Sequence, residues 1–248
     1  MPVNQRIWRK RHANLLDFFD AHVDSIPGWF ARSDAEALAA IDFIQKSRFN
    51  DGNLLELGVW EGRSLFFLAE LLAKSERLFG VDQFVAPGRT EGVKKRLADC
   101  RARKQLHLVR SDTKQFKHFD GLPRRSCRLV HVDADHEHSS VLTDLHVAME
   151  FLQPEGAILV LDDLPHRNWP GVWSAMAEWV LTTPGHDYRP FLITGSKGYL
   201  ARKNELPFWR QSVREVFPEH RFADREVFDS VAMVLNGPDG PPVMPHSI

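Results

Sequence analysis

The chain has 248 residues, of which 43% are hydrophobic and 26% charged. This composition is typical of a folded globular protein and excludes a chain that is disordered along its whole length. Lys and Arg number 32 and Asp and Glu 33, for a formal net charge of -1, so no overall positive field exists to bind a nucleic-acid backbone. Cys100 and Cys127 cannot form a disulfide framework, and the sequence shows no apolar run of signal-peptide or membrane-spanning type, which together predict a cytoplasmic protein without a membrane contact.

The chain begins with a predicted helical cap, residues 1–50. Apolar residues at helical spacing over 8–23 predict an amphipathic helix whose apolar face needs a partner surface. Ser33, followed three residues later by Glu36, is a capping-box pattern at the start of a second predicted helix over 35–44. The aromatic side chains of the cap are candidates for a small-molecule pocket, for core packing or for a homo-oligomer contact.

Short apolar runs then alternate with helical patterns. The predicted strands are residues 54–57, 78–81, 106–109, 129–132 and 157–161. The predicted helices between them are residues 64–73, 91–100, 113–119 and 140–152. Strict alternation with nearly continuous apolar strands predicts a parallel sheet covered by helices on both faces, which is a doubly wound α/β domain.

The last part of the chain departs from this alternation. A further helix is predicted over 172–180, and a hairpin follows it, with strands at 188–193 and 198–201. Beyond the hairpin we expect a helix over 208–217, a short apolar stretch at 231–235 and a proline-rich, poorly ordered tail. We therefore divide the chain into a cap (1–50), a core (51–203) and a C-terminal extension (204–248).

The first predicted strand leads through a glycine turn into a helix. Glu56 lies in the strand, Gly58 and Gly62 follow it, and the helical pattern opens at Ser64. Glycine permits a sharp turn and a close approach of the backbone to a ligand, and the helix N-terminus offers free N–H groups. We expect a small ligand to lie across this turn. The indole of Trp60 disfavours a pyrophosphate at this place, and no Lys-Ser or Lys-Thr pair follows Gly62, which excludes a P-loop.

Each predicted strand of this core ends in acidic residues. They are Glu56, Asp82, Asp112, Asp133 with Asp135, and Asp162 with Asp163. One such acid is as readily a turn former or a helix cap as a ligand contact. Five consecutive strand ends favour a site, because ligands of open α/β sheets bind beyond the carboxyl ends of the strands. Asp82 also lies 20 residues after Gly62 (82 minus 62), near the offset expected for an acid that binds ribose.

Glu56-x-Gly58-x-x-x-Gly62 with Asp82 resembles the S-adenosylmethionine-binding region of class I methyltransferases. The resemblance implies that a carboxylate near the turn receives the ammonium of the methionine moiety, that Asp82 accepts the ribose hydroxyls and that Ser111 and Asp112 neighbour the adenine. The cofactor-binding residues that it implies are Glu56, Gly58, Gly62, Ser64, Asp82, Ser111, Asp112 and Asp133.

A second motif, Asp133-x-Asp135-His136 with Asp162-Asp163 downstream, resembles methyltransferase family 24. These are small-molecule O-methyltransferases related to macrocin O-methyltransferase and to cephalosporin-hydroxylase-like proteins. Ala134 stands where the family often has Gly. The resemblance implies a Rossmann-like α/β fold with a seven-stranded, mostly parallel sheet whose last strand is antiparallel.

By position, the same acids parallel those of catechol O-methyltransferases. That resemblance implies Asp133, Asp162 and Asp163 as ligands of Mg²⁺, with Mn²⁺ as an alternative, and His136 as the catalytic base. Asp135 stays an alternative to Asp133 as a ligand, and the acids could also hold water or a substrate hydroxyl without metal.

The sequence thus predicts an S-adenosylmethionine-dependent methyltransferase that acts on a hydroxyl of a small molecule, such as a sugar or a secondary metabolite. The first alternative is a cephalosporin-hydroxylase-like or other non-methylating protein that keeps the nucleoside site. A nicotinamide-dependent oxidoreductase is opposed by Trp60. Nucleic-acid methylation is disfavoured by the charge and by the lack of an Asn/Asp-Pro-Pro-Tyr-like motif.

Overall fold

A nine-stranded sheet in the order β3-β2-β1-β4-β5-β7-β6-β9-β8 runs through the part of the chain that the structure describes. The structure is a computed structural model and describes residues 4–98, 100–115, 119, 121–164, 166–182 and 185–236. The strands are β1 (Asn53–Leu57), β2 (Leu78–Asp82), β3 (Leu106–Arg110), β4 (Cys127–Val132), β5 (Ile158–Asp162), β6 (Tyr188–Ile193), β7 (Lys197–Arg202), β8 (Arg221–Val227) and β9 (Ser230–Asn236).

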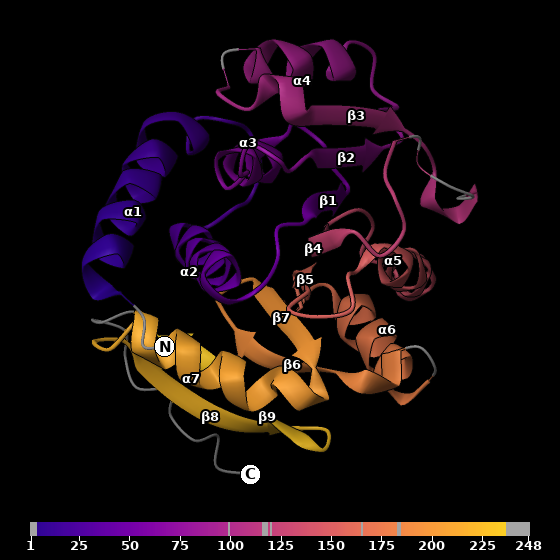
Figure 1. Cartoon of the computed structure of the whole chain (residues 1–248). Coiled ribbons are helices and arrows are strands. Elements are labelled where there is room, and N and C mark those ends of the chain that lie inside the picture. Colours follow the sequence, from indigo (N-terminus) through magenta and orange to yellow (C-terminus); the bar gives the residue numbers. More distant parts are fainter. Residues whose placement is uncertain are drawn as a thin grey trace.

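Helices cover both faces of this sheet (Figure 1). They are α1 (Gln5–Phe18), α2 (Arg32–Arg48), α3 (Arg63–Glu70), α4 (Arg89–Leu97), α5 (His138–Phe151), α6 (Pro170–Leu181) and α7 (Leu206–Val216), with a π-helical turn at Phe19–Val23 and 3₁₀ turns at Arg103–Gln105, Thr113–Gln115, Gly185–Asp187 and Lys203–Glu205. One apolar core joins α1, α2, α3, α4 and α7 to one face, and a second core joins α5 and α6 to the other. These layers confirm the predicted doubly wound α/β class.

Strands β1 to β5 pair in parallel, and β7 lies antiparallel between β5 and β6. The predicted antiparallel hairpin is present. The predicted count of seven strands is two short, because β9 pairs in parallel with β6 and β8 pairs with β9. The apolar stretch 231–235 is a strand of the sheet, and β8 was not recognised because charged residues interrupt its apolar pattern. Whether residue 203 separates two domains stays a prediction.

Two predicted helix signals differ from the structure. The capping box at Ser33 is wrong: α2 begins at Arg32 behind Ala31, and no side chain caps it. Of the predicted helix 113–119, the structure shows a 3₁₀ turn at Thr113–Gln115, and residues 116–118 lie outside the described ranges. The proline-rich tail also lies outside them. No helix among the described residues is long and apolar enough to cross a membrane.

A buried arginine joins α2 to the sheet. Arg128 on β4 is fully buried, and its guanidinium donates to Glu76 Oε1 at 2.6 Å, to Asp42 Oδ1 at 2.8 Å and to Gln45 Oε1 at 2.7 Å. Asp42 and Gln45 belong to α2. A buried charge is tolerated only when it is paired and hydrogen-bonded in this way. The network therefore fixes α2 on the face of the sheet that also carries the candidate site.

Candidate active site

The turn after β1 closes so tightly that only glycine fits at its first bend. Gly58 has a φ of 90°, and a Cβ built on it would lie 2.1 Å from the carbonyl oxygen of Asp133. Gly62 has a φ of 82° and is the N-cap of α3. Positive φ and close backbone contact are conditions that glycine alone meets without strain. The predicted strand, glycine turn and helix are thus present, and the turn packs against the end of β4.

Asp82, at the end of β2, holds this turn in place. Its Oδ2 accepts hydrogen bonds from the backbone N–H groups of Val59 and Trp60, each at 2.9 Å, and its Oδ1 accepts one from Phe84 N at 2.6 Å. These charge-assisted bonds stabilise Trp60 and Phe84 in left-handed backbone conformations with φ of 47°. The structure therefore gives Asp82 a role within the chain, and its predicted contact with ribose stays a prediction.

The other predicted contacts of the nucleoside lie around the turn. Ser64 is buried in the first turn of α3. The backbone N–H of Ser111 donates to the carbonyl of Asp82 at 3.0 Å, and Asp112 Oδ1 accepts from the backbone N–H of Lys114 at 2.9 Å. Ser111 and Asp112 thus follow β3 at the strand end next to Asp82, as the sequence predicted, but their contact with adenine stays a prediction.

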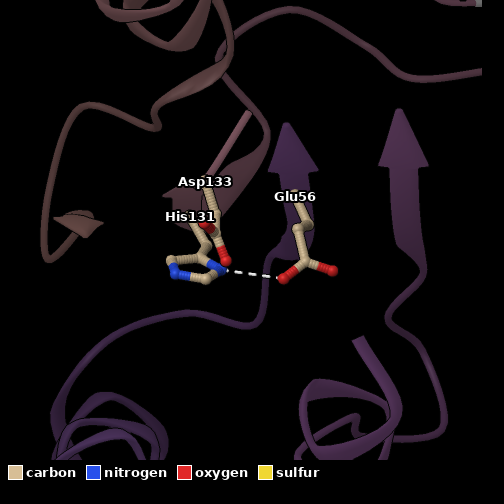
Figure 2. A group of neighbouring side chains, drawn as sticks. All are labelled: Glu56, His131 and Asp133. Atoms are coloured by element: carbon tan, nitrogen blue, oxygen red, sulfur yellow. Dashed lines mark hydrogen bonds and ion pairs between the residues drawn. The ribbon is translucent and has the colours of Figure 1, made fainter. Parts of the chain in front are cut away.

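A chain of polar side chains crosses the sheet on the face that α2 covers. Glu56 and His131 are paired neighbours on β1 and β4, and His131 Nδ1 lies 2.8 Å from Glu56 Oε1. His131 Nε2 lies 3.0 Å from Lys197 Nζ on β7, and that ammonium donates to Asp162 Oδ1 on β5 at 2.5 Å. Figure 2 shows Glu56, His131 and Asp133 pointing toward one another between β1 and β4. Glu56, His131, Lys197 and Asp162 are buried, and Asp133 is partly buried.

Asp133 and Asp162 form an acidic pair in which the two groups ionise differently. Burial raises the pKa of Asp133 well above its ordinary value, and the neighbouring Asp162 carboxylate adds to this effect. Burial also opposes ionisation of Asp162, but the Lys197 ammonium beside it outweighs this effect and lowers the pKa of Asp162 to about 2. Two close carboxyl groups cannot both ionise readily. Asp162 is therefore the ionised member of the pair.

The next residue of the chain, Asp163, contacts a different partner. It has a φ of 51°, and its Oδ2 lies 3.2 Å from Nε2 of His136, in the loop after β4. The ring of His136 packs on Trp169, with ring centroids 4.8 Å apart. The hydrogen bond to Asp163 raises the pKa of His136 above its ordinary value, against the lowering effect of partial burial. His136 and Asp163 thus form a separate pair at the same edge of the sheet.

Asp135 is the alternative ligand that the sequence left open. Its Oδ1 accepts hydrogen bonds from the backbone N–H groups of His136 at 2.8 Å and Glu137 at 3.4 Å, just before α5. A hydrogen bond from Ser140 and these backbone bonds lower the pKa of Asp135. Asp135 therefore stabilises the turn that leads into α5, and Asp133 is the residue that lies beside Asp162.

The predicted metal ligands do not form one ligand group. Among the described residues, the candidate group is Glu56, His131 and Asp133, whose ligand atoms lie within 4.8 Å of one another. Asp162 is instead paired with the Lys197 ammonium, and Asp163 with His136. The metal site of Asp133, Asp162 and Asp163 stays a prediction that the observed pairing opposes.

The sequence analysis missed two residues of this polar chain, His131 and Lys197. Each is a polar residue in a strand that is otherwise mostly apolar. A buried polar group needs a partner, so such residues indicate a partner on a neighbouring strand. Finding that partner requires the register, in which Glu56 faces His131 and Asp162 faces Lys197.

Asp144, on α5, gives a prediction about stability. Burial raises the pKa of Asp144 from its ordinary value of 3.8 to about 6. Between these values the folded protein holds a proton that the unfolded chain has released, so the free energy of unfolding decreases as the pH rises. We expect the stability of Asp144→Asn relative to the natural protein to rise by about 2 kcal/mol from pH 4 to pH 8. Urea unfolding at both pH values measures it, and a difference independent of pH would contradict it.

Comparison with known proteins identifies the domain. Residues 55–164 match the family model Methyltransf_24, which is described as a methyltransferase domain. This part of the chain is thus similar to a methyltransferase domain of this family. The match covers the glycine turn, Asp82, the pair of Asp133 and Asp162, and His136 with Asp163, and it confirms the predicted resemblance to methyltransferase family 24. A search of curated proteins found no match.

Two solved structures share the fold of this methyltransferase chain. The apo TDP-rhamnose 3′-O-methyltransferase of calicheamicin biosynthesis is 20% identical, with a TM-score of 0.51, over 80% of this chain and 93% of that one. An O-methyltransferase from Bacillus cereus, in complex with SAH, is 12% identical, with a TM-score of 0.54, over 77% of this chain and 89% of that one. At these identities the likeness shows the Rossmann-like fold.

Proposed function

We propose that this methyltransferase transfers the methyl group of S-adenosylmethionine to a hydroxyl of a small molecule, such as a sugar or a secondary metabolite. The observation that carries the proposal is the position of the glycine turn. It follows β1. In the sheet order β3-β2-β1-β4-β5, the chain adds β2 and β3 on one side of β1 and then returns to add β4 and β5 on the other side, so the switch point lies between β1 and β4. In open α/β sheets the ligand crevice lies at this switch point.

The acids around the turn suit a cationic cofactor. S-adenosylmethionine supplies a methyl group on a positively charged sulfonium and also carries an ammonium group. Glu56 Oε2 is buried and has no hydrogen-bond partner among the described residues. A buried acceptor without a partner is costly, so a donor from the ligand, such as the ammonium, would satisfy it. Asp82 ends β2 and Asp112 follows β3, so both carboxylates lie at strand ends beside the turn, where the nucleoside is proposed to bind.

His136 is suited to take the proton of the acceptor hydroxyl. Its Nε2 faces Asp163 at 3.2 Å, so Nε2–H donates to that carboxylate and Nδ1 remains as the basic nitrogen. This resembles the way in which a carboxylate orients the histidine of a catalytic triad. The hydroxyl oxygen would attack the methyl carbon of S-adenosylmethionine while its proton passes to Nδ1. The new O–C bond forms as the S–C bond breaks, and the electron pair of that bond stays on sulfur.

This assignment predicts a pH dependence. Because Asp163 raises the pKa of His136, the base is free only as the pH rises through that raised value, and kcat should increase over that range. Asp163→Asn removes the charge, so the pKa of His136 falls and the rise in kcat should move to lower pH. Profiles of kcat between pH 5.5 and 9 measure this shift. An unchanged profile in the variant would separate His136 from proton transfer.

Transfer of a labelled methyl group tests the function itself. The purified chain is incubated with S-adenosylmethionine labelled on the methyl carbon and with panels of sugars, nucleotide sugars and phenols. We expect label in a hydroxyl product, and we expect His136→Ala to lower kcat by about 10²- to 10⁴-fold while S-adenosylhomocysteine binding is kept. His186→Ala, an exposed histidine beside β6, is the matched control. Full turnover by His136→Ala would remove the base assignment.

A further inference from the structure

Lys197 carries a buried ammonium, and the proposed reaction assigns no role to it. It begins β7, directly opposite Asp162 on β5, and its side chain is fully buried. Its Nζ lies 2.5 Å from Asp162 Oδ1 and 3.0 Å from His131 Nε2. The same Nζ lies 5.5 Å from the ring centroid of Phe30 in the cap. A lysine is rarely buried to this extent unless a carboxylate pairs with it.

The contacts of Lys197 determine the hydrogen positions on His131. An ammonium only donates hydrogen bonds, so His131 Nε2 must accept. The proton of the neutral ring then lies on Nδ1, which donates to Glu56 Oε1 at 2.8 Å. Neither ring nitrogen of His131 is left with a free lone pair. The group of Glu56, His131 and Asp133 therefore does not offer an imidazole ligand to a metal while Lys197 is in place.

The ammonium also affects the predicted carboxylate ligands. A divalent cation held by Asp133 and Asp162 would lie near the Lys197 ammonium, and like charges repel strongly where water is largely excluded. Asp163 cannot compensate, because its carboxylate contacts His136. Asp133 and Asp162 thus suit one singly charged cationic group, and the Lys197 ammonium is that group.

We propose that the Lys197 ammonium takes the place of a divalent cation at this site, so that the protein neither binds nor needs Mg²⁺ or Mn²⁺ there. Lys197 is then a positioning residue that holds Asp162 beside Asp133 and fixes the tautomer of His131. The statement about catalysis rests on the proposed function, whereas the statement about cation binding does not.

Electron paramagnetic resonance of Mn²⁺ tests the proposal on the full chain after removal of metal with EDTA. We expect titration of the natural protein to leave the signal of free Mn²⁺ undiminished at micromolar concentrations. One bound Mn²⁺ per chain that Asp162→Asn releases would overturn the proposal. This measurement needs no substrate, and its first result comes from the natural protein alone.

Lys197→Met tests the same point in the opposite direction. Loss of the ammonium leaves Asp133 and Asp162 beside a His131 whose Nε2 is free, so we expect Mn²⁺ to bind at least tenfold more tightly than to the natural protein. Lys203→Met is the matched control, because it removes a lysine from Asp229 at the surface and should not change Mn²⁺ binding. A folded Lys197→Met protein, judged by circular dichroism, that gains no Mn²⁺ would contradict the proposal. If this variant does not fold, the natural protein decides.

Methyl transfer provides a separate result. EDTA-treated protein should keep its full rate with any acceptor that the labelled-methyl assay finds, and a rate restored only by Mg²⁺ would overturn the proposal. If no acceptor is found, the proposed function fails, and the Mn²⁺ titrations still decide the role of Lys197.

Discussion

Gly58→Ala is expected to abolish binding of S-adenosylhomocysteine and to lower the free energy of unfolding by about 3 kcal/mol or more. The added Cβ would lie 2.1 Å from the carbonyl oxygen of Asp133 and 2.4 Å from the Cα of Ala134. Both are backbone atoms, so neither can rotate away. The turn must open, and β1 must separate from the end of β4 at the switch point of the sheet. Urea unfolding and calorimetric titration measure the two effects.

Gly121→Ala is the matched control for this substitution. Gly121 also has a positive φ, 78°, but no described atom lies within 4 Å of the position that a Cβ would take there. Alanine at this place meets only the backbone strain, about 1 kcal/mol, and should bind the cofactor product normally. If Gly58→Ala behaved like Gly121→Ala, the close packing of the turn on Asp133 would be wrong.

Arg128→Met is expected to lower the free energy of unfolding by about 3 to 5 kcal/mol, because it leaves buried acids without their main counter-charge. Glu76 would keep only backbone donors, and Asp42 would keep Arg11 and Lys46. Chemical unfolding measures the loss. The control is Arg124→Met, which breaks an exposed pair with Glu150 and should cost less than about 1 kcal/mol.

A double variant separates charge from packing at the same place. If unpaired charge causes the loss, Arg128→Met with Glu76→Gln should recover part of the stability, because the buried acid is then neutral. Equal stability of Arg128→Met and Arg124→Met would show that the buried network does not hold α2 on the sheet.

The sequence was sufficient for the features that depend on local pattern. Apolar runs and helical spacing located the strands of the parallel core, since β1, β2, β4 and β5 are largely buried and contain few polar residues. The glycine turn was predictable because a turn with positive φ at Gly58 and Gly62 restricts the residue type. The acids at the strand ends followed from their positions after each apolar run.

The pairing of those acids could not be predicted, because it depends on contacts between distant parts of the chain. Asp162 and Asp163 are adjacent in sequence, yet one contacts Lys197 from β7 and the other contacts His136 from the loop after β4. Their separation arises from the insertion of β7 next to β5 and from the positive φ of Asp163. The sequence motif assigned both acids to one metal ion. The register of the sheet instead places Lys197 of β7 opposite Asp162 of β5.

The central claim is that the glycine turn binds S-adenosylmethionine, and calorimetric titration of the metal-free natural protein with S-adenosylmethionine and S-adenosylhomocysteine tests it most directly. We predict one site per chain with a dissociation constant in the micromolar range for both, unchanged by Mg²⁺ and absent in Gly58→Ala. No binding of either compound to the natural protein would contradict the claim, and binding of NADH in their place would point to the oxidoreductase alternative.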